Sequence, residues 1–323
     1  MKKSSALITG ITGFAGSFLA EELLKHGYKV SGTVYNNEPT DNITAIKKDL
    51  QLVALDILKA EKCRRVIKKI KPDYIFHLAA IASVGQSFQL ERLTFKINFE
   101  GTLNLLDAAR DNSGLKKFIF IGSAECYGIF EPKGKTLTEK QPFNPVSPYG
   151  VSKVAAELLT KYYTLHYHLP TGIARPFNHS GPRQNEHFVI PAFARQIALI
   201  ETGRQGPVIQ VGDLTPERDL SDVRDIVTGY RLIAEKGESG EVYQLSSGRA
   251  VSIKKVLDTL LKLSDKTIKV KTDKERLRKV DIPILRGSNR KAVQKLGFRL
   301  RYGLEDTLKD TLNYWRNQLA KTY

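Results

Sequence analysis

Near its amino terminus the 323-residue chain reads Ala6-Leu7-Ile8-Thr9-Gly10-Ile11-Thr12-Gly13-Phe14-Ala15-Gly16. Its first four residues form a short apolar run typical of a buried strand, and an amphipathic stretch from Phe18 to His26 predicts a helix. Glycines between a strand and a helix let backbone N–H groups approach a pyrophosphate, whose charge the helix N-terminus favours. The stretch therefore predicts a phosphate-binding turn, with the spacing Gly-x-x-Gly-x-x-Gly.

Apolar runs alternate with amphipathic stretches over the following residues. The expected strands are 29–34, 52–55, 74–78, 118–121, 172–174 and 242–245. Strands that alternate with helices form βαβ units, so we expect an α/β fold with a doubly wound parallel sheet. After Asn178 the pattern loosens. We therefore expect one domain from residues 1–178 and about 215–246, and a smaller, discontinuous C-terminal lobe from about 179–214 and 247–323.

The composition is that of an ordinary globular protein, with 41% hydrophobic and 26% charged residues. No apolar stretch approaches the roughly 18 residues that span a bilayer, and the first predicted strand leaves no room for a signal peptide. The cysteines, Cys63 and Cys126, suggest no disulfide framework. We expect a cytoplasmic protein without a membrane partner.

The formal net charge of +17 is unusual. It is consistent with a field that attracts an anionic substrate, with nucleic-acid binding, or with a lysine-rich solvated surface. We favour the last interpretation because lysine pairs are scattered along the chain. No recognition-helix, zinc-finger or RNA-binding signature accompanies the charge, so we expect no nucleic-acid partner.

A candidate acid-base site lies in the run Ser147-Pro148-Tyr149-Gly150-Val151-Ser152-Lys153. Tyr149 and Lys153 are four residues apart and would share one face of a helix. A nearby ammonium favours the phenolate and draws the tyrosine pKa from about 10 toward neutral pH. Ser123 follows the predicted strand 118–121, at the sheet edge where α/β proteins bind ligands. Its hydroxyl could bind a substrate oxygen beside Tyr149.

The chain resembles the extended short-chain dehydrogenase/reductase superfamily from about residue 5 to 315. The resemblance rests on these motifs and on Asp56-Ile57, His77-Leu78-Ala79-Ala80, Asn98 and the stretch 121–128, in order and separation. The stretches 175–184 and 211–225 are similar to the branch that acts on GDP-mannose derivatives. The resemblance implies a Rossmann-type, NAD(P)-binding first domain and a sugar-nucleotide-binding lobe.

The resemblance also implies roles for the acid-base residues. Tyr149 would donate a proton to a carbonyl oxygen, assisted by Ser123, and Lys153 would lower the tyrosine pKa and bind the nicotinamide ribose. Glu125 matches the base of sugar-nucleotide dehydratases, but related reductases also carry a glutamate there. Ala124 precedes it where dehydratases often have Thr, Ser or Asp, which favours reduction.

The implied reaction is NADP(H)-dependent reduction of the 4-keto group of a GDP-4-keto-6-deoxy-hexose. The alternatives are GDP-mannose 4,6-dehydration, nucleotide-sugar 4-epimerisation and a catalytically silent relative that binds NADP or RNA. The intact set of Ser123, Tyr149 and Lys153 argues against a silent relative. The resemblance does not fix the choice among the three reactions.

The expected cofactor site is built from residues of several motifs. They are Gly10, Thr12, Gly13, Phe14, Gly16, Asn36, Asp56, Ile57, Leu78, Ala79, Ala80, Tyr149, Lys153 and Pro176. The second predicted strand ends in Val34-Tyr35-Asn36-Asn37, without the Asp that selects NAD or the Arg that accommodates a 2′-phosphate. The loss of the acidic residue favours NADP(H), and NAD(H) is possible.

The resemblance implies substrate contacts that include three arginines, which suit phosphate oxygens. The set is Ser83, Glu125, Asn178, Val189, Arg195, Arg218 and Arg278. The run from Arg278 to Asp281 departs from the Arg-Pro-x-Glu pattern of relatives, which leaves the base and ribose contacts open. We expect no metal, because no further ligands surround His179 and His187 at zinc-like spacing.

The resemblance further implies a homodimer. Two helices of each subunit, around 92–110 and 149–167, would pack as a four-helix bundle. Val154, Leu158, Leu159 and Tyr162 are consistent with a helix buried on more than one side.

Overall fold

The computed structural model describes residues 3–36, 38–132, 134–277 and 281–320. Its largest element is a seven-stranded sheet with the order β10-β6-β5-β4-β1-β2-β3, parallel throughout. The strands are β1 (Ser5–Thr9), β2 (Lys29–Val34), β3 (Leu50–Ala54), β4 (Tyr74–His77), β5 (Lys117–Ile121), β6 (Thr171–Pro176) and β10 (Val242–Leu245). The strand order reverses between β1 and β4, which creates the switch point where such sheets bind ligands. The predicted Rossmann-type fold is confirmed.

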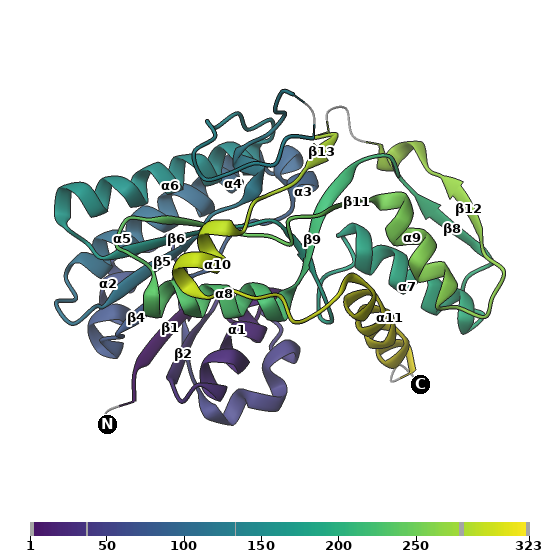
Figure 1. The fold of residues 1–323 in the computed structure, drawn as a ribbon. Coiled ribbons are helices and arrows are strands. Elements are labelled where there is room, and N and C mark those ends of the chain that lie inside the picture. Colours follow the sequence, from purple (N-terminus) through teal and green to yellow (C-terminus); the bar gives the residue numbers. More distant parts are fainter. Residues whose placement is uncertain (1–2, 37, 133, 278–280, 321–323) are drawn as a thin grey trace.

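Helices cover both faces of this sheet (Figure 1). One face carries α1 (Phe14–Lys25), α8 (Val223–Lys236) and α10 (Arg290–Leu296) over a core that includes Leu19 and Ile233. The other face carries α2 (Ala60–Ile70), α5 (Gly101–Arg110) and α6 (Pro148–Tyr167) over Leu105, Leu106 and Ala156. Burial on both faces explains why the strands read as continuous apolar runs.

Short helical segments lead from β4 into α5. They are α3 (Val84–Gln89), α4 (Glu91–Phe95) and a π-helical turn, Lys96–Glu100. A 3₁₀ segment, Asp41–Asp49, lies between β2 and β3.

The glycine-rich turn brings α1 close to β1. Gly10 has a φ of +70°, and a Cβ on Gly16 would lie 2.1 Å from the Gly10 carbonyl oxygen. The helix begins at Phe14, before the predicted Phe18, because Gly13 has the extended backbone of an N-cap and Gly16 lies within the first turn. The small residues Ala15 and Gly16 give no amphipathic signal, so the sequence pattern does not predict this first turn of the helix.

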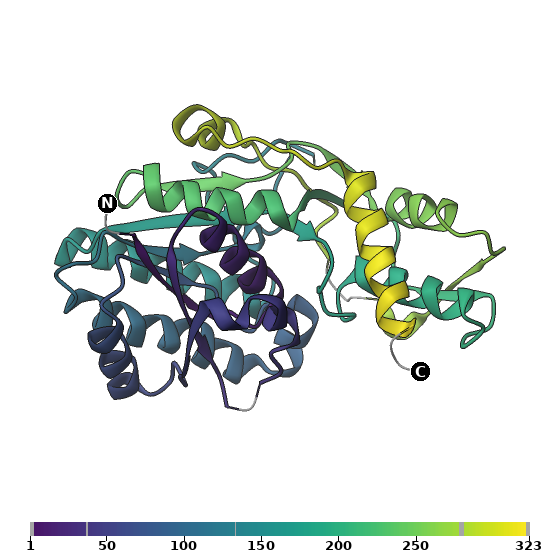
Figure 2. The same cartoon turned by 90° about the horizontal axis from the view of Figure 1, so that it is seen from below.

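A smaller lobe lies beside the Rossmann domain (Figures 1 and 2). It contains α7 (Val189–Glu201), α9 (Ile253–Lys262), α11 (Leu304–Ala320) and the parallel pair β8 (Val208–Val211) and β12 (Lys269–Thr272). Their core includes Ile197, Leu257 and Leu312. Figure 2 shows α11 on the side of the lobe that faces the Rossmann domain.

The chain passes between the two units several times. Strand β9 (Glu217–Asp222) pairs with β7 (Asn178–Ser180), β11 (Ala250–Ser252) and β13 (Ile284–Leu285). From β9 the chain returns to the Rossmann domain through α8 and β10, and later α10 packs against α8 and β10 before α11. Among the helices of the described residues, none combines the length and apolarity needed to cross a membrane.

Candidate active site

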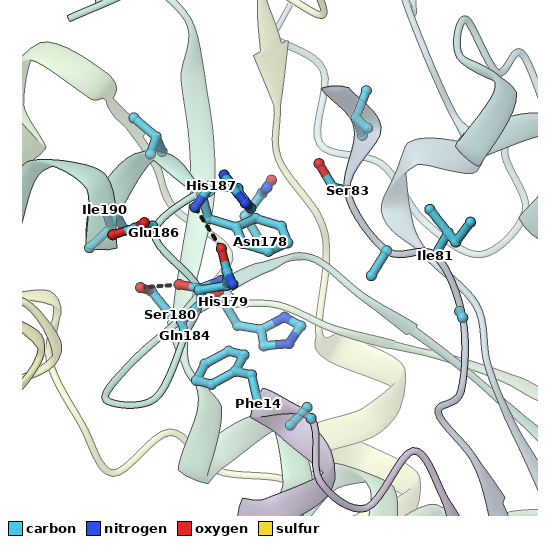
Figure 3. Close-up of a pocket in the computed structure, with 18 of the residues that line it drawn as sticks. Phe14, Ile81, Ser83, Asn178, His179, Ser180, Gln184, Glu186, His187 and Ile190 are labelled. Carbon is cyan, nitrogen blue, oxygen red and sulfur yellow. Dashed lines mark hydrogen bonds between the residues drawn. The ribbon is translucent and has the colours of Figure 1, made fainter. Parts of the chain in front are cut away.

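A cavity of about 1660 Å³ opens between the carboxyl ends of the central strands and the smaller lobe. It exceeds the roughly 300–1,000 Å³ typical of small-molecule pockets, which leaves room for two large ligands. Figure 3 shows Ser83 and Ile81 on one side of it and Asn178, His179 and His187 on the other.

Most of the predicted cofactor residues line this cavity. They are Gly10, Thr12, Gly13, Phe14, Gly16, Asp56, Ile57, Leu78, Ala79, Ala80, Tyr149 and Pro176. The buried Thr12 Oγ1 has no hydrogen-bond partner among the described residues. The N-terminus of α1 has no side-chain cap. Both features leave polar groups available to an anionic ligand.

Asn36 and Lys153 are the predicted cofactor residues that do not line the cavity. Asn36 lies in a turn after β2, with a φ of 43°, while its neighbour Tyr35 faces the cavity. Two carboxylates that the sequence reasoning did not place at this end, Glu38 and Asp41, line it as well. The end of the cavity beside β2 therefore carries negative charge, although residues 34–37 include no acid.

Tyr149 stands at the start of α6 and faces the cavity. Ser147 caps the helix by accepting from the Gly150 N–H at 3.0 Å, and Pro148 occupies the first turn. Burial raises the pKa of Tyr149 to about 12, while a hydrogen bond with Ser123 opposes this rise. The tyrosine is therefore a neutral phenol that can donate a proton.

The predicted lowering of the Tyr149 pKa by Lys153 is wrong for this structure. The Lys153 Nζ donates to the Ile121 carbonyl oxygen at 2.7 Å and lies 6.0 Å from the centroid of the Tyr149 ring. Burial lowers the pKa of Lys153 itself to about 7. Desolvation is the largest cause of both shifts, and it is the only resolved cause for Lys153.

Glu125 lies in a 3₁₀ turn, Ala124–Cys126, directly after β5. Ser123, Ala124 and Glu125 all line the cavity, and the Glu125 charge helps to raise the pKa of Tyr149. Ala124, which precedes Glu125, contributes a methyl group to the cavity and no polar atom of its side chain. The buried Cys126 thiol has a pKa raised to about 12 by burial, which makes it unreactive.

Ser83, Asn178 and Val189, which the resemblance predicts to contact substrate, all line the cavity. Ser83 caps α3, and the buried Oδ1 of Asn178 has no hydrogen-bond partner among the described residues. An unpaired buried amide oxygen is costly unless a ligand donates to it.

His179, which no predicted role covered, stacks on Phe14 with ring centroids 5.9 Å apart. It bonds the Phe177 carbonyl oxygen through Nδ1 at 3.0 Å, and burial lowers its pKa. The neutral ring therefore lies between Phe14 of the glycine-rich turn and the side of the cavity that holds Asn178 (Figure 3).

The predicted arginines face the cavity with acidic partners. Arg195 pairs with Glu186. Arg218 donates to Asp281 Oδ1 and to the Ile282 carbonyl oxygen, each at 2.6 Å. Arg278 lies outside the described residues. These pairs hold the guanidinium groups in place while leaving further N–H donors.

Arg276 also lines the cavity, although the sequence reasoning did not select it. A Cβ on Gly212 would lie 2.8 Å from the Arg276 carbonyl oxygen, so the glycine permits this close packing. Tyr314, Trp315 and Gln318 enter from α11, which no motif marked. Among the described residues no three His, Cys, Asp or Glu side chains form a group that could hold a metal ion.

A dinucleotide-sized cleft at the switch point, lined by a serine-bonded tyrosine with a buried lysine one helical turn behind it, defines a short-chain dehydrogenase/reductase. The chain belongs to the GDP-mannose 4,6-dehydratase family, whose model matches residues 7–311.

Relatives with different reactions resemble the chain. GDP-6-deoxy-D-mannose reductase of Pseudomonas aeruginosa is 32% identical over 77% of this chain and 82% of its own. GDP-mannose 4,6 dehydratase 2 of Arabidopsis thaliana is 33% identical over 94% of this chain and 84% of its own. The solved structure of RMD from Pseudomonas aeruginosa, complexed with NADPH, has a TM-score of 0.83 at 29% identity, covering 98% of this chain and 100% of its own.

Proposed function

We propose that the protein reduces the 4-keto group of a GDP-4-keto-6-deoxy-hexose with NADPH, in deoxysugar nucleotide biosynthesis. The observation that carries the proposal is the cluster of Ser123, Ala124, Glu125 and Tyr149. A neutral tyrosine is ready to protonate a keto oxygen, and position 124 holds an alanine rather than the Thr, Ser or Asp that often precedes the base in dehydratases. The likeness to the Pseudomonas reductase supports this choice.

In this proposal the nicotinamide supplies the hydride when it is bound. Tyr149 donates the proton to the keto oxygen, and Ser123 holds the tyrosine hydroxyl and orients the substrate. Lys153 offers positive charge beside the phenolate that forms. Asn178 and Ser83 orient the sugar, and Glu125 positions it without removing a proton.

NADP(H) is the preferred cofactor in the proposal, because the similar Pseudomonas structure holds NADPH. NAD(H) is possible because Glu38 and Asp41 line the end of the cavity beyond β2. The glycine-rich turn and Thr12 would hold the pyrophosphate, and Asp56 and Ile57 would flank the adenine.

In this proposal, different parts of the chain bind the cofactor and the sugar nucleotide. Residues 1–178, with about 215–246, bind the cofactor. The segments of about 179–214 and 247–323 bind the sugar nucleotide, except for α10, which packs on the Rossmann domain against α8 and β10. Arg195, Arg218 and Arg276 suit the diphosphate through their fixed guanidinium groups. Both cysteines are buried and free, which is consistent with a reducing, cytoplasmic location.

GDP-mannose 4,6-dehydration is the second candidate, and Glu125 in the cavity beside Tyr149 favours it. Two incubations separate the reactions. A reductase consumes NADPH stoichiometrically with the 4-keto sugar. A dehydratase converts GDP-mannose with NADP⁺ to the 4-keto sugar and shows no net change in cofactor absorbance, and that result would contradict the proposal.

Glu125→Gln gives a second measurement. In a reductase the amide still positions substrate, so we expect turnover to fall only about tenfold, because no proton abstraction is lost. In a dehydratase the same change removes the C5 base and would cost about a hundredfold or more. Steady-state rates of the wild type and of Glu125→Gln, measured with each substrate at equal concentrations of folded protein, distinguish the reductase from the dehydratase.

We also propose that the protein is a homodimer built on α6 and the segment 91–110. On α6 an apolar stripe of Val151, Leu158, Tyr162 and Leu165 faces outward, and Leu165 is 79% exposed. These positions recur at heptad-like spacing on one helix face. Leu90 and Leu93, beside α6, extend the apolar surface. A second copy of the same helices would cover this stripe with its own apolar stripe, which makes another copy of this chain the partner that we propose.

Leu158→Asp combined with Leu165→Asp should convert the dimer to a monomer, because burying unpaired carboxylates in an apolar interface is costly. Light scattering at micromolar concentration measures the mass. Val270→Asp, on the exposed edge of β12, is the control that should leave the dimer intact. A monomeric wild type would refute the proposal.

A further inference from the structure

A buried polar network lies under the catalytic helix, outside the cavity. Arg175 of β6 and Glu157 of α6 are 2% and 1% exposed. The arginine donates twice to the carboxylate, from Nε to Oε2 at 2.8 Å and from Nη2 to Oε1 at 2.6 Å. Gly122 lies beside this pair, where a Cβ would make an ordinary contact of 3.5 Å with Glu157 Oε2.

The same guanidinium reaches the turn that carries Glu125. Arg175 Nη1 donates to the Tyr127 hydroxyl at 2.6 Å, and Gln244 Nε2 of β10 donates to that hydroxyl at 2.5 Å. Tyr127 follows the Ala124–Cys126 turn and is fully buried. The network therefore joins α6, the turn after β5, and two strands of the sheet.

The geometry relates this network to the catalytic residues. Tyr149, Lys153 and Glu157 are spaced four residues apart on α6, so they share one face of the helix. Tyr127 is two residues from Glu125 and four from Ser123. One end of the arginine thus holds the tyrosine helix, and the other end holds the serine–glutamate turn.

A buried ion pair contributes little net stability, because desolvation offsets the attraction between the charges. Apolar residues of similar size often preserve stability at such sites. A directional contact of this kind fixes relative orientation in a way that apolar packing does not.

We propose that Arg175, acting through Glu157 and Tyr127, is a positioning residue that sets the Ser123–Glu125 turn against Tyr149. The proposal rests on the proposed function only in taking Ser123 and Tyr149 as the reacting side chains. Reduction, dehydration and epimerisation would all need that alignment.

The test replaces the pair with apolar residues, Glu157→Met with Arg175→Met. We expect a melting temperature close to wild type, an NADPH dissociation constant within about twofold, and an unchanged KM, because neither residue lines the cavity. Turnover should fall by about tenfold to a hundredfold, the cost of a small misplacement of reacting groups. Turnover within twofold of wild type in the folded variant would overturn the proposal.

Tyr127→Phe decides the matter if the double variant misfolds. It removes one hydroxyl and should lower turnover at least about fivefold in folded protein, with substrate and cofactor affinity retained. Wild-type turnover in folded Tyr127→Phe would then refute the proposal.

Arg231→Met is the matched control. Arg231 is another largely buried arginine, held by Glu22 and Glu235 between α1 and α8. It should leave turnover per folded molecule unchanged. All variants are assayed on whichever reaction the wild type catalyses, so a dehydratase result would reject the proposed function while leaving this test intact.

Discussion

Tyr149→Phe should abolish turnover while leaving cofactor affinity within several-fold of wild type. The phenol hydroxyl is the group that carries the proton, and general acid catalysis is worth roughly 10²–10⁴-fold. The aromatic ring, which phenylalanine keeps, fills its buried place in α6. NADPH titration by fluorescence and single-turnover kinetics measure the two quantities separately.

Tyr163→Phe is the control on the same helix. Its hydroxyl donates to Asp107 Oδ1 at 2.6 Å, away from the cavity. The Tyr163→Phe variant should have a lower free energy of unfolding than wild type and the same turnover per folded molecule. A near-normal kcat for Tyr149→Phe would remove the tyrosine from the mechanism.

Lys153→Ala should damage both turnover and cofactor affinity, because the ammonium has two proposed roles. Its pKa of about 7 adds a pH dependence. The charged fraction of Lys153 falls as pH rises through about 7, so wild-type turnover should decline above neutral pH. The alanine variant should show a flat, low profile over the same range.

Stability should follow the opposite trend over that pH range. Between about 7 and the ordinary lysine pKa of about 10.5, the unfolded chain binds a proton at Lys153 that the folded chain does not. The contribution of Lys153 to the free energy of unfolding therefore rises with pH there. Urea unfolding at several pH values distinguishes this effect from the loss of activity.

Lys117→Met provides the comparison for Lys153. Lys117 is also buried, and its Nζ donates to carbonyl oxygens at the end of α8, including Ala234 at 3.1 Å. Its loss should lower stability and leave cofactor affinity unchanged. Equal losses of affinity in the two lysine variants would contradict a specific role for Lys153.

The sheet and the glycine-rich turn could be predicted because they depend on local patterns. Strands buried on both faces appear in the sequence as continuous apolar runs, and β2 and β10 have the predicted limits. The tyrosine, lysine and serine were found because their chemistry requires fixed spacing on one helix and one strand end.

The rest of the site depends on contacts between distant segments. Arg276, Glu38 and the α11 residues Tyr314 and Trp315 enter the cavity through tertiary packing that no short motif encodes. The pKa of Tyr149 was misjudged for the same reason. Sequence spacing shows that a lysine is near, but it does not show that the lysine is bonded to the Ile121 carbonyl oxygen.

The repeated passage of the chain between its two units limits how such a protein can diversify. Because α8, β10 and α10 of the Rossmann domain are interleaved in sequence with the segments of the smaller lobe, no single crossover between genes can exchange that lobe intact. Exchange of the lobe would need several crossovers, whereas one substitution along the cavity changes one ligand contact at a time. The two units should also melt together, since neither is a continuous stretch of chain that could fold by itself.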